Sequence, residues 1–423
     1  MVNFTHLLTL LIAQYGIIAT ALPRQVRQAS PPSQYAANRL LDGLSDDPYQ
    51  DSAHFRVYGA DAATANKTLG ILEAAHQCFV QDLGWRTPGL DNKKGRVGKE
   101  VGPWYKMKVY KDETISIRSA AGATEPNYDM GLALLRITEG YLTSPRVLGH
   151  EFGHAMHFSE KRWWETVANF VAELYVATPT CDQARSVFGV RGGDSIIHLT
   201  RVIGDSHQVI VDATSGSSNH YHAWPFLSYI TNSPDSYSGL GKQIVLDMIR
   251  KYPLNSNETP LHTIERLLGR GVGVQKVIGR YWARMAYVDI GNAKAQSKFN
   301  LERKSLNYAN LDDLGHGRYM VKAARAPRYM GANIIPLKAS ASKVSVTVMA
   351  DGSYTATLAV KGGSSTRYVE LNGGKGEVTL ASDEGLSLVV ANTPTLVQYD
   401  AFNISAELNR GLIYSVQLFG AIV

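Results

Sequence analysis

Cysteine is scarce in this 423-residue sequence, which contains only Cys78 and Cys181. Two cysteines exclude a small domain held together by several disulfides and any cysteine-rich zinc module. They leave two alternatives, one Cys78–Cys181 disulfide or two separate buried thiols. No stretch reaches the roughly 18 apolar residues that a membrane-spanning helix needs. No block of Lys and Arg with interleaved aromatic residues is present either, so nucleic-acid binding is not expected.

The composition is that of a folded protein. Hydrophobic residues make up 44% of the chain and charged residues 19%, and the net charge is +6. These values supply a sizeable core and exclude general disorder. A chain of this length is expected to form more than one domain.

The N-terminus has the features of a secretory signal. Apolar stretches at 7–12 and 16–19 precede Ala19-Thr20-Ala21, which fits the small-x-small pattern of a cleavage site. We therefore expect residues 1–21 to be a signal peptide of a secreted, extracellular protein with no membrane contact after its removal; the alternative is a buried N-terminal helix. Residues 22–51 are expected to be a pro-segment or flexible arm. Secretion agrees with three N-glycosylation sequons, at Asn66, Asn257 and Asn403.

The remaining chain changes character near residue 336. Residues 52–335 mix two periodicities: strand patterns at 54–58, 105–110 and 132–137, and helical patterns at 62–83, 224–231, 241–252 and 260–268, besides the two helices described below. Residues 336–423 contain short alternating runs at 344–350, 354–360, 367–371, 377–380, 386–390 and 412–418. Gly-rich turns between such runs indicate an antiparallel β-sandwich. The expected fold class is α+β, a mixed sheet with active-site helices followed by a C-terminal β-sandwich.

The segment that carries chemistry begins at Ser144, a good helix N-cap that is followed by a proline. A helix starting there carries His150 and His154 four residues apart and therefore on one face. Two neutral imidazoles at that spacing can bind one Zn²⁺. Glu151 can then act as general base towards a water molecule that the metal activates. This is the HExxH arrangement.

A catalytic zinc site needs a third protein ligand. His157 would lie about 10 Å from His150 on a straight helix, too far to share one ion, so we assign it a structural or supporting role. The next amphipathic helix would fold back and bring Glu165 close to the histidines, although a first-turn carboxylate is commonly solvent-exposed. Asn169, one turn later, could accept an N–H from a ligating histidine. The competitor Glu173 is turned roughly 80° away on a regular helix.

These motifs resemble a known class of enzymes. The HExxH motif at His150, followed by Trp163-Trp-Glu-Thr-Val-Ala-Asn-Phe, looks like the gluzincin class of zinc metallopeptidases. The second stretch is also similar to that of microbial collagenases, and a longer similarity, from Ser52 to the C-terminal strands, extends to a poorly characterised group of secreted microbial HExxH proteins. The resemblance implies zinc ligation by His150, His154 and Glu165, and general base/acid catalysis by Glu151. The chain departs from thermolysin-like members in a shorter gap before the third ligand and in having Asn where they have Asp.

A group that stabilises the oxyanion should complete such a site. His220, Tyr221 and His222 fall in one loop ahead of an expected helix. Gluzincins use a downstream His or Tyr to polarise the scissile carbonyl, so Tyr221 or His220 is the candidate; the alternative is that these residues serve packing or the surface.

The sequence therefore predicts a secreted zinc metallopeptidase with one catalytic Zn²⁺ and a protein or peptide substrate. Two other functions stay open. One is a secreted binding or effector protein with a structural or vestigial zinc site, whose β-sandwich contacts a glycan or a host protein. The other is a metal-dependent hydrolase of a non-peptide bond, such as a glycan linkage.

Overall fold

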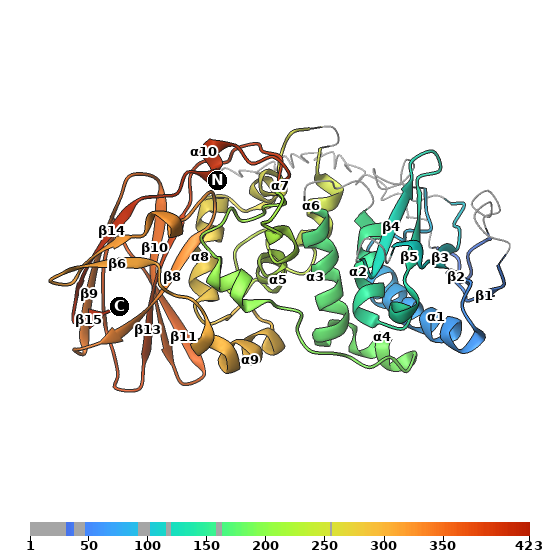
Figure 1. The fold of residues 1–423 in the computed structure, drawn as a ribbon, viewed down its shortest axis with the longest axis horizontal. Coiled ribbons are helices and arrows are strands. Elements are labelled where there is room, and N and C mark those ends of the chain that lie inside the picture. The colour runs from blue at the N-terminus through green and yellow to red at the C-terminus, as the bar shows by residue number, and fades with distance from the viewer. Residues whose placement is uncertain (1–30, 38–46, 92–101, 116–119, 158–162, 254–255) are drawn as a thin grey trace, which may run out of the picture.

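The computed structural model describes residues 31–37, 47–91, 102–115, 120–157, 163–253 and 256–423. The expected signal peptide and most of the expected pro-segment therefore lie outside the described residues. The chain is α+β and passes from a mixed sheet through a group of helices to two antiparallel sheets (Figure 1). Within the described ranges, no helix combines the length and the apolar character required to cross a bilayer.

The first sheet has five strands in the order β1-β2-β3-β5-β4. Their bounds are β1 Tyr49–Asp51, β2 Phe55–Tyr58, β3 Met107–Lys111, β4 Gly122–Asn127 and β5 Leu132–Ile137. The three central strands are parallel, whereas β1 and β4 run antiparallel along the two edges. The strands predicted at 54–58, 105–110 and 132–137 are confirmed to within two residues. The edge strand β4 was not predicted, because it contains Pro126 and lacks alternating apolar residues.

Three helices connect this sheet to the centre of the molecule. Asp61 caps α1 (Ala62–His76) by accepting two backbone N–H groups of its first turn. The helix predicted at 62–83 continues past α1 as a π-helical segment, η2 (Gln77–Asp82). Helix α2 (Pro145–His157) contacts β4 and β5, and α3 (Trp164–Ala177) packs along α2.

Glycines on α2 allow α3 to approach closely. A Cβ atom on Gly153 would lie 3.0 Å from the Cα of Ala168, and one on Gly149 would lie 3.1 Å from the ring of Tyr175. Each glycine costs about 1 kcal/mol of helix propensity relative to alanine. The close helix crossing supplies the physical reason for that cost.

A second group of helices occupies the middle of the molecule in Figure 1. It comprises α5 (Trp224–Asn232), α6 (Ile244–Lys251), α7 (Pro260–Leu267), α8 (Val274–Met285) and α9 (Ala293–Glu302). Helices α5 to α7 correspond to the three that the sequence predicted at 224–231, 241–252 and 260–268. Helices α8 and α9 were not predicted.

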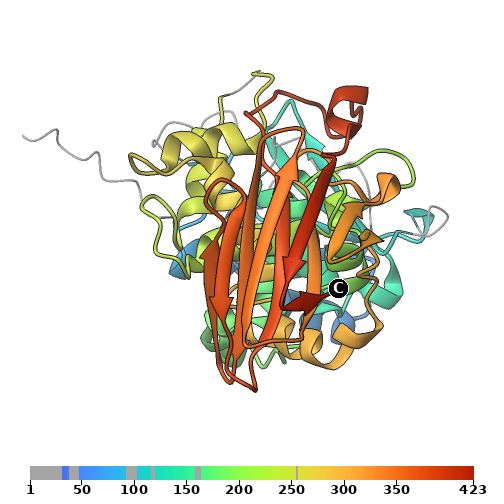
Figure 2. The ribbon, with the colours of Figure 1, turned by 90° about the vertical axis from the view of Figure 1, so that its left-hand side faces the viewer.

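The C-terminal region forms two antiparallel five-stranded sheets, ordered β11-β10-β13-β8-β15 and β12-β9-β14-β7-β6. Figure 2 views this end of the molecule, with the long strands running nearly vertically. The bounds are β6 Leu311–Gly315, β7 Arg318–Val321, β8 Ala332–Ala339, β9 Lys343–Ala350, β10 Tyr354–Gly362, β11 Ser365–Glu370, β12 Lys375–Thr379, β13 Gly385–Asn392, β14 Tyr414–Phe419 and β15 Ala421–Ile422. The six predicted strand runs all overlap strands of these sheets.

The two sheets share one apolar core, to which Leu358 and Leu388 contribute from one sheet and Val346 from the other. The sheet that contains β10 and β13 is buried on its other face as well, because Ala359 and Val389 belong to the core of the helical region. The sheets also include β6 and β7, which precede the predicted boundary at residue 336. That short hairpin is mostly exposed, so no alternating apolar pattern marks it.

The structure decides between the alternatives for the cysteines, since Cys78 and Cys181 form a disulfide. It joins η2 to η5 (Pro179–Cys181), the short turn that follows α3. The three sequon asparagines Asn66, Asn257 and Asn403 are all exposed.

Replacing both cysteines with alanine is expected to lower the free energy of unfolding by about 2–4 kcal/mol, because the bond restricts the unfolded chain. The two cysteines are 103 residues apart, so the closed loop is long. Urea unfolding of the oxidised protein, the dithiothreitol-treated protein and the double variant would measure the difference. Equal midpoints for all three would contradict a stabilising role.

Candidate metal centre

Three side chains from α2 and α3 converge on one point. The Nε2 atoms of His150 and His154 are 3.1 Å apart, and each lies 3.2 Å from Oε2 of Glu165. Three ligands held tetrahedrally at 2.0–2.1 Å from a zinc ion are about 3.3–3.4 Å from one another. The triangle therefore fits one zinc ion with only slight movement of its side chains.

Asn169 on α3 fixes the protonation of His150. Its Nδ2 atom donates to the carbonyl oxygen of Tyr221 at 2.7 Å, so its Oδ1 atom is left to accept from Nδ1 of His150 at 3.0 Å. With the proton on Nδ1, the Nε2 atom presents a lone pair to the centre. A lone pair facing a carboxylate at 3.2 Å is unfavourable unless a cation lies between them. The donor set is thus arranged for a cation.

The charges at the centre agree with this arrangement. Burial raises the pKa of Glu165, but the contacts with His150 and His154 outweigh that effect and hold the pKa well below its ordinary value. Burial lowers the pKa of His150, but its contact with Glu165 and the charge of Glu151 raise it overall. Because protons and a metal ion compete for the same imidazole, metal binding weakens as the pH falls.

Glu151 lies beside the triangle and is 5% exposed. The Oγ1 atom of Thr124 donates to its Oε2 atom at 2.7 Å and also lies 2.9 Å from its backbone oxygen. A Cβ atom on Gly122 would come within 3.0 Å of its Oε1 atom. Strand β4 therefore orients this carboxylate. Nothing in the sequence marked Thr124, because its role follows from the pairing of β4 with β5.

The loop at 219–222 contributes Tyr221 to the site. Burial, followed by the proximity of Glu165, raises the pKa of Tyr221, so its hydroxyl stays protonated and able to donate. His220 does not line the cleft; its Nδ1 atom lies 3.2 Å from the backbone oxygen of Asp212. Of the two sequence candidates for the oxyanion group, the structure brings only Tyr221 to the centre. His222 lines the cleft further away, 5.1 Å from the ring of His198.

His157 and Glu173, the other two residues weighed as metal ligands, are both buried. The ring of His157 lies edge-on to that of His154 at 5.4 Å, and burial, with a further contribution from His154, lowers its pKa to about 3. Glu173 is fully buried, where it accepts hydrogen bonds from the backbone N–H of Ile196 at 2.8 Å and from Nδ2 of Asn292 at 2.7 Å. It is therefore occupied away from the metal centre.

Two hollows meet at the centre. One has a volume of about 250 Å³ and the other of about 670 Å³, and they share Gly122, His150, Glu151 and Tyr221. Trp164 and Pro126 line the smaller hollow only, whereas Arg146 and His198 line the larger one only. The hollows form a cleft that crosses the metal centre alongside β4.

A second group of possible ligands, formed by His54, Glu73 and His76, lies where α1 packs against β2. Nδ1 of His54 is 2.6 Å from Oε2 of Glu73, and the rings of His54 and His76 stack at 3.7 Å with 14° between their planes. Two imidazoles on one ion must both point a nitrogen at it within the ring plane, which stacked rings do not do. Burial lowers the pKa of His76 to about 3. This group is a buried hydrogen-bonded cluster.

Comparison with known proteins adds a family but no activity. The family model described as "Family of unknown function (DUF6055)" matches residues 43–423, a range that includes the whole metal centre and the C-terminal sheets. No curated protein matches the chain.

We predict that the purified protein holds one equivalent of zinc, that His150→Ala removes it, and that His76→Phe does not. The reason is that only the first cluster directs its donor atoms at one point. Inductively coupled plasma mass spectrometry after gel filtration would measure the zinc content. Loss of zinc from His76→Phe, with retention in His150→Ala, would show that the second cluster holds the metal and the first does not.

Proposed function

The chain belongs to DUF6055, a family of unknown function, and we propose that it is a secreted zinc-dependent peptidase with a zincin-like catalytic region. The observation that carries this proposal is the convergence of His150, His154 and Glu165 in an open cleft, with the carboxylate of Glu151 beside them. Three protein ligands leave a coordination position for water or substrate, as in catalytic zinc sites.

His150, His154 and Glu165 would hold the ion. A bound zinc ion would activate water and polarise the carbonyl of the scissile bond. Glu151 is next to the first ligand but outside the triangle, so its carboxylate is free to accept the proton of the attacking water and pass it to the leaving amine. The hydrogen bond from Thr124 holds that carboxylate in place.

Strand β4 supports a peptide as the substrate. It is the last strand of its sheet, and its residues line the smaller hollow at the metal centre. No other strand of the described chain pairs with its outer edge. An extended peptide can add to such an edge through main-chain hydrogen bonds, which would hold the scissile bond alongside Glu151.

Tyr221 supports the stabilisation of negative charge. Its hydroxyl belongs to a side chain that lines both hollows. A protonated phenol at that place can donate a hydrogen bond to the oxygen of the substrate carbonyl as charge develops on it.

Glu151→Gln is expected to keep the fold and one equivalent of zinc but to lower the rate of peptide hydrolysis by about 10²–10⁴-fold or more, because the amide cannot accept the proton. Mass spectrometry of an unbiased peptide library, with and without a chelator, would measure cleavage. Zinc content and circular dichroism serve as controls. Undiminished, chelator-resistant cleavage by the variant would refute the assigned role.

Tyr221→Phe is expected to lower kcat by about 10²–10³-fold with little change in KM, because it removes a donor that acts mainly on the developing oxyanion. His220→Gln is the matched control, because His220 directly precedes Tyr221 but lies outside the cleft. This substitution should change kcat by less than about threefold. Steady-state kinetics on a cleaved library peptide would compare them. A larger decrease in kcat for His220→Gln than for Tyr221→Phe would assign stabilisation of the oxyanion to His220.

A further inference from the structure

A hollow with a volume of about 720 Å³ lies next to the cleft. We propose that this hollow, here called the basic pocket, binds an acidic segment of the substrate, on one side of the scissile bond. The inference rests on the proposed peptidase function, since it assigns a substrate class to the same cleft. Its volume is in the range typical of ligand pockets.

The basic pocket is continuous with the cleft. Ser144, Arg146 and Ile196 line both the basic pocket and the larger hollow of the cleft. Arg146 precedes the ligand His150 by four residues on α2, a rise of about 6 Å. An extended peptide covers about 3.3 Å per residue, so residues some two to four positions from the scissile bond would reach the basic pocket.

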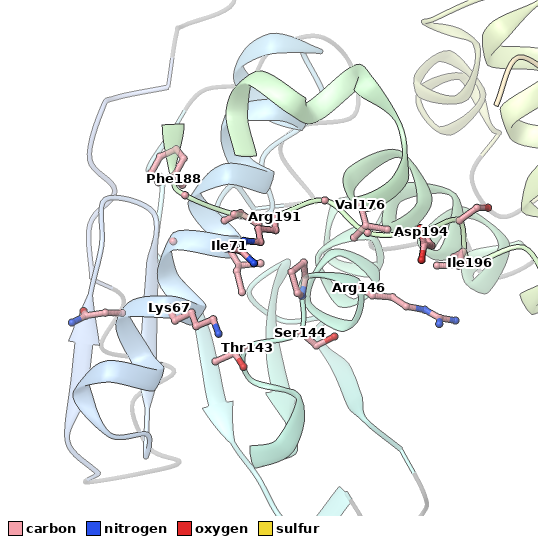
Figure 3. A pocket seen from close by; sticks show the side chains of 18 residues that line it. Lys67, Ile71, Thr143, Ser144, Arg146, Val176, Phe188, Arg191, Asp194 and Ile196 are labelled. Atoms are coloured by element: carbon pink, nitrogen blue, oxygen red, sulfur yellow. The ribbon is translucent and has the colours of Figure 1, made fainter. Parts of the chain in front are cut away.

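Its lining carries an excess of positive charge. Three of its lining residues are cationic: Lys67 from α1, Arg146 from α2 and Arg191 from the segment after α4 (Asp182–Val187). Asp194 is the single acidic residue among the described lining residues. None of these three cations forms an ion pair with an acidic residue of the described chain. In Figure 3 the side chains of Lys67 and Arg191 lean towards the start of α2 near Ser144, whereas Arg146 extends to the side of Ile196.

The charge of the described lining residues lies on one side of the metal centre. The smaller hollow, on the other side, has no Lys or Arg among its described lining residues. Carboxylates form charge-assisted hydrogen bonds with Lys and Arg side chains, and complementary charge sets the register of a bound chain more than it sets its total affinity. The geometry therefore assigns acidic residues of the substrate to the side that reaches Ser144.

Binding can be measured without turnover, using the Glu151→Gln protein and two fluorescent peptides of equal length, one with four consecutive Glu residues and one with four Gln. The Glu peptide is expected to bind about tenfold more tightly at low salt, an effect of two or three exposed charge pairs. Added Lys67→Gln and Arg191→Gln substitutions should remove that preference. The matched control, Arg318→Gln with Lys338→Gln, removes the same charge from exposed positions in the C-terminal sheets and should retain it.

Equal affinity for the two peptides, or an equal loss of preference in the control, would overturn the assignment. Tight binding of heparin without discrimination between the peptides would overturn it too, in favour of a polysaccharide site. The outcomes for the two proposals are distinguishable. Library cleavage by the wild-type protein without an acidic preference would refute the role of the basic pocket and leave the peptidase function intact. Selective binding of the Glu peptide without any library cleavage would support the basic pocket and refute the peptidase function.

Discussion

The close contact between α2 and α3 is the constraint on which the metal centre depends. The two histidines come from one helix and the glutamate from the other, and their donor atoms meet within 3.2 Å. That meeting requires the backbones to approach at Gly153 and Ala168, where a single added methyl group would be too close. A few small residues thus bring three possible metal ligands together on two adjacent helices, at the cost of the helix propensity that each glycine loses.

The same contact assembles groups that oppose one another when neither a proton nor a metal ion lies between them. A lone pair of His150 faces the carboxylate of Glu165, and burial makes both groups harder to solvate. The surrounding hydrogen bonds hold this arrangement: Asn169 keeps the ring of His150 in one tautomer, and Thr124 keeps Glu151 to one side. The division between proposed ligands and proposed base therefore depends on Asn169 and Thr124, neither of which belongs to the HExxH motif.

Features that depend on a few neighbouring residues can be predicted from this sequence, whereas features that depend on distant segments cannot. The placement of His150 and His154 depends on four residues of one helix, and that of Glu165 on the packing of two consecutive helices. Thr124 depends on strand pairing, and the basic pocket depends on three segments far apart in the chain; no periodicity reveals either. Helix α8 is a different case, since Val274, Val277, Ile278 and Tyr281 do follow helical spacing and are buried. The sequence therefore does carry a signal for this helix, whereas the hairpin β6–β7 has too few buried residues to give one.

The C-terminal region contributes to the cleft through a chain of hydrogen bonds. The backbone of Ala401 accepts from Ala213, and the hydroxyl of Tyr399 donates to Val211. The backbone N–H of His220 donates in turn to the oxygen of Asp212 in that same segment, at 3.0 Å. The next residue is Tyr221, whose backbone oxygen accepts from Asn169 and whose side chain lines the cleft. Because the first C-terminal sheet is also buried against the helices, this region is joined by direct contacts to the segment that carries Tyr221, beside the candidate metal centre.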